Sequence, residues 1–293
     1  MTVERRAAGE VSGIALAVAA ILMFALMDVI AKGLLTRNEP IMVVWARFAS
    51  QTFWAVVLLM PRLRQVMRTR HMPLQILRSA CLFGATIFFF SAIPRMDLAT
   101  IVAIFEIAPL LITVLAFLIL REPVGPRRLL AVGVGLIGAL IIIQPGTEVF
   151  TPWALLPIGA AACFASYAIA TRFLGADESP WTSFLYTALF GTIAATAIVP
   201  FFWATPSLSD AVIMSLFGIV GGFGHFLLIL ALSRTEASSI APFTYVGLVF
   251  ATIFAWIFFD ELPGPPTFVG AAIIIGAGLY VWYRERRAMA RTA

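Results

Sequence analysis

The stretch Arg95-Met-Asp97, followed by Thr113, Ala116, Glu122 and Gly125-Pro126, recurs at a constant offset of 139 residues as Arg234-Thr-Glu236, Thr252, Ala255, Glu261 and Gly264-Pro265. Each copy belongs to a half of the chain that holds five hydrophobic segments. A repeat with an odd number of membrane crossings inserts its second copy upside down. Inverted repeats are typical of secondary transporters, because two similar halves that exchange conformations expose one site to either side of a membrane.

The composition predicts an all-α membrane protein. Of 293 residues, 61% are hydrophobic and only 12% are charged, whereas soluble domains carry about 25% charged residues. The strands of a β-barrel would alternate in hydropathy, and these segments are continuously apolar. Cys81 and Cys163 lie inside apolar segments, which favours small core residues over a disulfide or a metal site. The net charge of +5 comes from arginines that flank the segments, so nucleic acid is not an expected partner.

Ten segments are long and apolar enough to cross a bilayer. They cover residues 11–35, 41–60, 74–93, 97–120, 128–144, 152–174, 181–203, 209–232, 236–259 and 264–283. The first is read as a retained span rather than a signal peptide, since it contains Asp28 and Lys32. The expected architecture is ten transmembrane helices in two inverted five-helix repeats, residues 1–148 and 149–293.

The distribution of basic residues predicts the orientation. With the N-terminus inside, 16 of the 20 lysines and arginines, Arg78 among them, fall on the cytoplasmic side. Lys32, Arg37 and Arg95 fall outside, and Arg47 lies within the second segment. We therefore expect a multi-pass protein of a bacterial inner membrane with both termini cytoplasmic.

Four motifs carry a family resemblance. They are Glu122 before Gly125, Glu261 before Gly264, the run Phe24-Ala-Leu-Met-Asp28 with Lys32, and Trp45-Ala-Arg47-Phe48. On these residues the whole chain resembles the ten-helix, EamA-type members of the drug/metabolite transporter superfamily. The family usually has Gly where Arg121 and Asp260 stand, and Pro in two places where this chain has Pro109 and Leu248. The resemblance implies movement of amino acids, nucleotide-like cofactors or cationic drugs through a central cavity by alternating access.

Ionisable side chains inside a bilayer are costly and are therefore candidates for function. Asp28, Arg47 and Glu106 are expected at similar depth in the first half. They could form an ion cluster that only holds helices together, or a gate, a coupling site or a substrate-binding site. Asp28 or Glu106 could take up a proton, and exchange without proton coupling is equally open. Lys32 could pair with Asp28 one turn away, but we expect it to extend to the outer surface.

The repeat offset relates polar residues of the two halves. It carries Asp28 to Tyr167, Glu106 to Tyr245 and Thr86 to His225. Our hypothesis is that these residues line the cavity together with Phe24 and Phe89; the alternative is ordinary packing inside the bundle. Aromatic walls suit planar substrates, including cations.

Proline and glycine mark the moving and the close-packed parts. Pro109 and Pro242 are expected to kink their helices. Gly133-x-Gly135-x-x-Gly138 lies in an apolar segment without a preceding strand, so it indicates close helix packing rather than a dinucleotide site. The glycine-rich segments 128–144 and 264–283 could also join two copies into a homodimer. Glu122 and Glu261 are expected to cap the helices that follow them.

The sequence thus predicts a secondary transporter of small metabolites, most simply an exporter of amino acids, aromatic ones included. The alternative is a transporter of cationic drugs or nucleotide-like cofactors. The expected partners are a small-molecule substrate and the lipid bilayer, with no cofactor and no bound metal. An enzyme is not expected, because His71 and His225 belong to no cluster with metal spacing.

Overall fold

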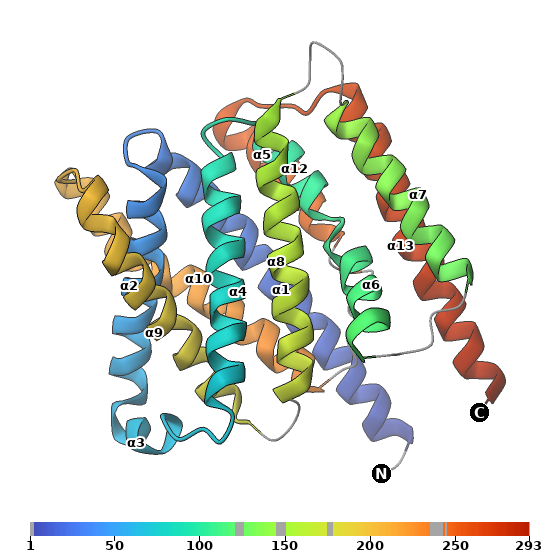
Figure 1. The fold of residues 1–293 in the computed structure, drawn as a ribbon, viewed down its shortest axis with the longest axis horizontal. Helices are drawn as coiled ribbons and strands as arrows, with labels where there is room; N and C mark the ends of the chain where they lie inside the picture. Colours follow the sequence, from blue (N-terminus) through green and yellow to red (C-terminus); the bar gives the residue numbers. More distant parts are fainter. Residues whose placement is uncertain are drawn as a thin grey trace.

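The computed structural model describes residues 3–120, 126–144, 151–174, 178–234, 243 and 245–292, and its regular elements in those ranges are all helical (Figure 1). The helices are α1 (Val3–Leu35), α2 (Pro40–Leu59), α3 (Leu63–Val66), α4 (Met72–Ala92), α5 (Leu98–Phe105), α6 (Ala108–Leu120), α7 (Pro126–Ile143), α8 (Leu155–Leu174), α9 (Pro180–Ile198), α10 (Leu208–Arg234), α12 (Val246–Phe259) and α13 (Pro265–Thr292). Short 3-10 turns cover Met60–Arg62, Pro152–Ala154 and Val199–Phe202.

Six described helical stretches have the length and apolar composition of membrane spans, and four shorter apolar ones accompany them. The six are Gly13–Leu35, Pro40–Val66, Met72–Ala92, Pro152–Thr171, Pro180–Phe202 and Leu208–Ala231. Large apolar side chains such as Leu58, Leu130 and Ile193 are more than 60% exposed on the outer face, which suits contact with lipid. The prediction of an all-helical membrane protein is confirmed, while the count of ten spans and their inverted arrangement stay predictions.

Proline starts several of these helices. Pro40, Pro73 and Pro180 occupy the first or second position of α2, α4 and α9, where no backbone N–H is needed. Asp97 begins α5 by accepting a hydrogen bond from the Thr100 N–H at 2.8 Å. These signals place the starts of the helices close to the boundaries expected from the sequence.

The segment 97–120 is not one helix. It is interrupted at Glu106 and Ile107, where α5 ends and α6 begins. Pro109 lies in the first turn of α6 rather than inside a continuous kinked helix, because the chain leaves helical geometry before reaching it. The other expected kink, at Pro242, lies outside the described residues.

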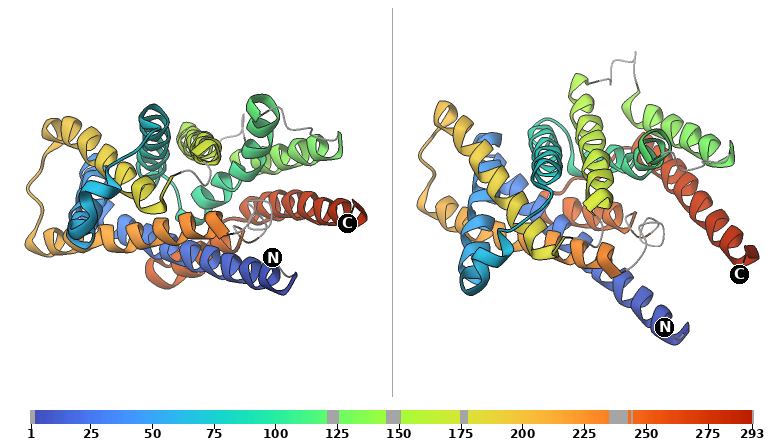
Figure 2. Two further views of the ribbon diagram at one scale, coloured as in Figure 1. Left: turned by 90° about the horizontal axis from the view of Figure 1, so that it is seen from below. Right: turned by 60° about the horizontal axis from the view of Figure 1, so that its bottom comes forward.

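The two halves of the chain are packed into each other. α1 lies along α10, α4 along α8, and α7 along α13, so each pair joins one helix from each half (Figures 1 and 2). Glycine allows the third contact, since a Cβ on Gly138 would lie 2.8 Å from the Gly270 carbonyl oxygen. These glycines of the glycine-rich helices therefore serve packing within one chain, and a homodimer stays a prediction.

The turn between α12 and α13 uses a left-handed residue. Asp260 has φ 54°, and the N–H groups of Asp260 and Glu261 bond to the carbonyl oxygens of Trp256 and Ala255. This geometry closes a helix C-terminus and favours glycine. It accounts for the glycine that the family usually places before this glutamate.

Candidate functional site

Arg47 is the centre of a buried polar cluster inside the bundle. It projects from α2, is 1% exposed, and donates hydrogen bonds to Thr86 Oγ1 on α4 and, at 2.6 Å, to His225 Nε2 on α10. A guanidinium only donates, so His225 Nε2 accepts and Nδ1 carries the proton. Phe24 of α1 packs on the His225 ring with the ring centroids 4.7 Å apart. Four predicted residues from both halves therefore meet here.

Asp28 lies one helical turn from Phe24 on α1 and is 9% exposed. The positive charge of Arg47 attracts the negative charge of the Asp28 carboxylate. Among the described residues, however, the Asp28 carboxylate forms neither a hydrogen bond nor an ion pair. A buried carboxylate without a direct partner is costly, so Asp28 is a candidate for contact with a ligand.

Aromatic rings extend in a row from α4 to α8, and we call these four residues the aromatic series. The ring centroids of Phe89 and Phe105 are 5.6 Å apart, those of Phe105 and Phe164 5.4 Å, and those of Phe164 and Tyr167 5.8 Å. The three phenylalanines are only partly buried, whereas Tyr167 is 1% exposed. The series gives α4, α5 and α8 a shared surface on which a flat ring could stack.

Arg78 is a buried residue that sequence reasoning placed on the cytoplasmic flank. It is fully buried on α4, and its guanidinium lies 5.0 Å from the Tyr167 ring. Its five N–H groups go to Thr171 Oγ1, Gln75 Oε1, Thr187 Oγ1 and, twice, the Ser183 carbonyl oxygen, at 2.9–3.3 Å. Ser183 and Thr187 lie one turn apart on α9, and Thr171 lies on the neighbouring α8. These three hydroxyl residues were the signal in the sequence for a buried donor.

Glu106 and Tyr245 form a second buried region. Glu106 lies at the break between α5 and α6, with its Oε1 3.6 Å from the position of a Cβ on Gly247 of α12. Tyr245 is the N-cap residue of α12, and its hydroxyl interacts electrostatically with the Glu106 carboxylate. This buried hydroxyl has no hydrogen-bond partner among the described residues. Glu106 thus lies against α12 rather than in the Arg47 cluster.

Gly278 on α13 makes room for Tyr245. A methyl group there would overlap the Tyr245 hydroxyl and lie 2.6 Å from Cε2, while a Cβ on Gly276 meets nothing within 4 Å. We expect Gly278→Ala to destabilise the protein by about 1–3 kcal/mol through overpacking, measured as a lower Tm in detergent. Gly276→Ala is the control and should leave Tm unchanged. If the two variants unfolded alike, Tyr245 would not occupy this gap.

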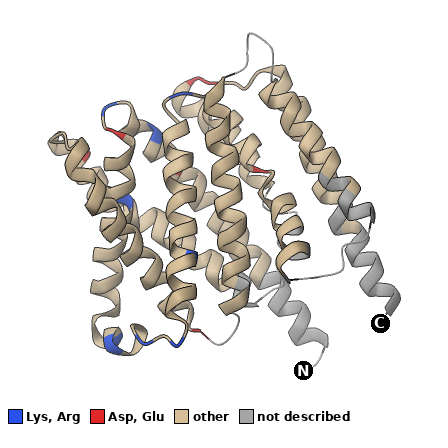
Figure 3. Cartoon of the chain, viewed as in Figure 1, with Lys and Arg blue, Asp and Glu red and all other residues tan. Residues whose placement is uncertain are grey.

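Ion pairs join the two halves at the end of the bundle where α1 connects to α2. Figure 3 shows basic and acidic positions at this end. Lys32 Nζ bonds to Glu261 and lies 4.8 Å from the Phe259 ring. The expectation that Lys32 extends to the surface is therefore wrong, because the ion pair holds it inside. Glu261 pairs with Lys32 instead of capping α13, and Glu122 lies outside the described residues.

A second ion pair lies at the same end of the bundle. Arg37 donates to both Asp210 carboxylate oxygens, at 2.7 and 3.2 Å, and Asn38 donates to Asp210 at 3.2 Å. The Asp210 carboxylate raises the pKa of the Arg37 guanidinium. These contacts connect the α1–α2 turn to the start of α10, so they fasten this end of the bundle across the two halves.

Two of the three offset pairs come close in space. Thr86 and His225 both hold Arg47, Glu106 and Tyr245 share one region, and both Tyr167 and Tyr245 are buried. The same offset carries Arg47 to Tyr186, which departs from this pattern and donates to the Met67 carbonyl oxygen at 2.9 Å. No group of three metal-binding side chains occurs among the described residues.

Comparisons with known proteins place this geometry in context. The model of the EamA-like transporter family matches the chain twice, over residues 11–144 and 151–283. The chain is 32% identical to an S-adenosylmethionine uptake transporter of Rickettsia felis, with 90% of each chain covered. It is 33% identical to a riboflavin transporter of Brucella anthropi, covering 82% of this chain and 89% of that one. The resemblance read from the repeated motifs is confirmed.

Two more distant matches are a transporter and a solved structure. A pseudopaline exporter of Pseudomonas aeruginosa is 24% identical over 91% of this chain and 94% of its own length. A solved crystal structure matches with a TM-score of 0.66 and 19% identity, covering 94% of this chain and 98% of that one, so it shares the fold.

Proposed function

Because the chain belongs to the EamA-like transporter family, we propose that it is a secondary transporter for a small metabolite with a flat, nitrogen-containing aromatic ring. Membership makes the chain a multi-pass membrane transporter of the drug/metabolite superfamily and not an enzyme. The adenine of S-adenosylmethionine and the tricyclic ring of riboflavin are rings of this kind. The carrying observation is the aromatic series, which ends at the buried Tyr167, whose ring lies 5.0 Å from the Arg78 guanidinium.

Export of amino acids, the simplest expectation from the sequence, has no support among the relatives named above. Their names favour the alternative of nucleotide-like cofactors. The side chains favour it too, because three consecutive ring contacts offer more stacking surface than one amino-acid side chain needs.

The transport cycle that we propose is alternating access. The two halves, residues 1–148 and 149–293, would be inverted repeats that rock about the Arg47 cluster in a bacterial inner membrane with both termini cytoplasmic. The ion pairs of Lys32 and Arg37 would then close the outer end and break when it opens. Proton coupling through Asp28 or Glu106 stays a prediction.

Flux into proteoliposomes tests the substrate class. We expect labelled S-adenosylmethionine or riboflavin to enter, and tryptophan to enter much more slowly. Phe164→Leu should slow the ring substrates by about two- to tenfold, since an aromatic contact is worth about 0.5–1.5 kcal/mol. Phe223→Leu, on a side chain 52% exposed, is the matched control. Flux of tryptophan alone would restore amino-acid transport, and flux of none of the three would overturn the proposal.

Asp28 is proposed to meet a positive charge on the substrate. Two unit charges 4 Å apart attract by about 4 kcal/mol at an effective dielectric of 20, so losing even a third of this slows uptake about tenfold. We therefore expect Asp28→Asn to reduce S-adenosylmethionine uptake at least tenfold, with Asp28→Glu retaining more. Competition by S-adenosylhomocysteine, which lacks the sulfonium charge, should change less than about twofold. Equal losses for both ligands would show that Asp28 does not meet the sulfonium, since the two ligands share their ammonium group.

A further inference from the structure

A basic segment follows α2 at the end of the bundle opposite the Lys32 pair. Arg62, Arg64, Arg68 and Arg70 fall within nine residues, and all four are exposed. Within the described part of the chain none of them forms an ion pair with a carboxylate. Exposed arginines at the other end are engaged, Arg37 by Asp210 and Arg95 by the Trp153 ring at 4.4 Å. The basic segment therefore has positive charge available for another molecule.

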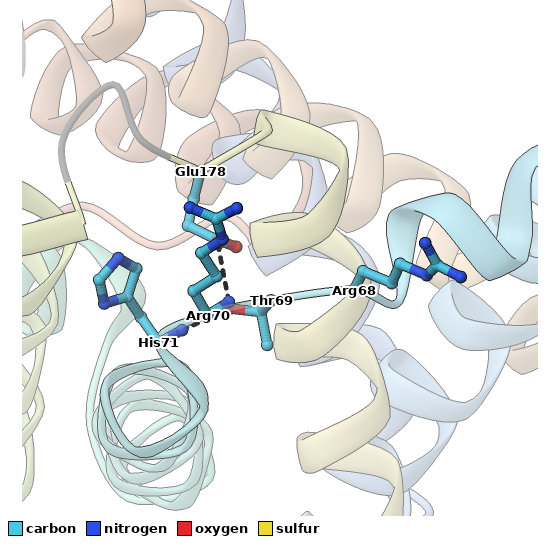
Figure 4. A pocket seen from close by; sticks show the side chains of 5 residues that line it. All are labelled: Arg68, Thr69, Arg70, His71 and Glu178. Carbon is cyan, nitrogen blue, oxygen red and sulfur yellow. Dashed lines mark hydrogen bonds between the residues drawn. The ribbon is translucent and has the colours of Figure 1, made fainter.

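Part of this segment forms a pocket (Figure 4). The pocket has a volume of about 730 Å³ and is lined by Arg68, Thr69, Arg70, His71 and Glu178. Glu178 precedes α9, so the walls come from both halves of the chain.

Among the described residues that line the pocket, the one carboxylate is held by neutral donors. Glu178 Oε1 accepts from the Arg70 backbone N–H at 3.4 Å, and Oε2 accepts from Gln75 Nε2 at 3.2 Å. Neither bond uses an arginine side chain. The lining side chains carry two guanidiniums and one carboxylate among the described residues, a net positive charge suited to a phosphate group. Figure 4 shows Arg70 pointing toward Glu178 and Arg68 extending away from both, so the Arg68 side chain would turn toward Arg70 to share one phosphate.

Exposed apolar side chains flank the pocket-lining residues along the chain. The segment connects two stretches of membrane-span composition, Pro40–Val66 and Met72–Ala92. Leu58, Met67 and Met72 nearby in the chain are 66%, 48% and 44% exposed. A soluble phosphate would need the arginines only. A lipid would use both features, because its headgroup lies at the level where a span ends and its acyl chains lie along the span.

We propose that this pocket binds the headgroup of an anionic phospholipid, with the phosphodiester held by Arg68 and Arg70 and the acyl chains along the exposed apolar side chains. Since the loop belongs to the first half and Glu178 to the second, the bound lipid would fasten this end of the bundle across the two halves.

The test is a thermal-shift titration of the purified full-length protein in detergent with phosphatidylglycerol, with phosphatidylcholine as the uncharged comparison. Phosphatidylglycerol should raise Tm, and phosphatidylcholine should not. Arg68→Gln/Arg70→Gln should raise the half-saturating phosphatidylglycerol concentration at least tenfold. Arg62→Gln/Arg64→Gln removes the same charge from the same segment but not from the pocket, and should change this concentration less than about twofold.

Three results would overturn the proposal. Equal weakening by the two double variants would mean that diffuse surface charge attracts the lipid. Equal stabilisation by glycerol phosphate, which has the anion without acyl chains, would mean a site for free phosphates. No preference for phosphatidylglycerol over phosphatidylcholine would mean no anionic lipid site. Because all four arginines are exposed, the variants should have wild-type Tm in phosphatidylcholine, which checks their folding.

Discussion

A methyl group at Gly218 is expected to push α10 away from α2 and to slow transport at least tenfold. The Gly218 N–H bonds to Ser50 Oγ at 2.8 Å, so the two helices touch almost backbone to backbone. A Cβ there would overlap the Gln51 nitrogen and lie 2.7 Å from its Cα, and these backbone atoms cannot rotate away. The separation would also stretch the 2.6 Å bond between Arg47 on α2 and His225 on α10.

We expect Gly218→Ala to lower the free energy of unfolding by about 3 kcal/mol, the upper end for overpacked sites. Flux per folded molecule should fall at least tenfold, which separates the loss of the Arg47 bond from a loss of protein. Gly33→Ala is the control, because a Cβ there meets nothing within 4 Å. Wild-type Tm and flux in Gly218→Ala would show that α2 and α10 do not cross at this point.

The positions of the helices could be predicted from the sequence because the lipid environment allows few backbone conformations. A crossing segment must satisfy its own backbone hydrogen bonds, so apolar length alone indicates a helix. The segments expected at 41–60 and 209–232 accordingly appear as Pro40–Leu59 and Leu208–Arg234. A distortion of the segment 97–120 was predictable from Pro109, which lacks a backbone donor. A full break at Glu106 and Ile107 was not predictable, because the segment is apolar on both sides and Glu106 lies against α12, far away in the sequence.

The partners of charged residues were the hardest part to predict. Lys32 finds Glu261 across 229 residues, and no local pattern distinguishes that pair from a side chain reaching for the surface. Arg78 looks like a flanking residue by its position along the chain, yet the hydroxyls of α8 and α9 hold it inside. The Arg47 cluster was easier to predict, since the internal repeat relates Thr86 to His225 and so links residues from distant parts of the chain.

Arg78 should tolerate methionine better than lysine. Arg78 uses all five N–H groups on neutral acceptors, with no carboxylate among them. Lysine keeps the buried charge but offers three donors, so at least two charge-assisted bonds are lost, each worth about 1.5–3 kcal/mol. Methionine loses more bonds but removes the cost of burying the charge. The Thr171 and Thr187 hydroxyls already donate to backbone carbonyls, so methionine leaves their protons satisfied.

We therefore expect Arg78→Lys to destabilise the protein by about 3 kcal/mol or more, and Arg78→Met by less, as measured by Tm in detergent. Arg47 provides the comparison, since it makes two side-chain hydrogen bonds and its buried Nε has no hydrogen-bond partner among the described residues. Arg47→Lys should lose less stability than Arg78→Lys but more flux per folded molecule, because Arg47 lies in the proposed substrate site and Arg78 braces α4 against α8 and α9. The reverse order in both measurements would exchange these two roles.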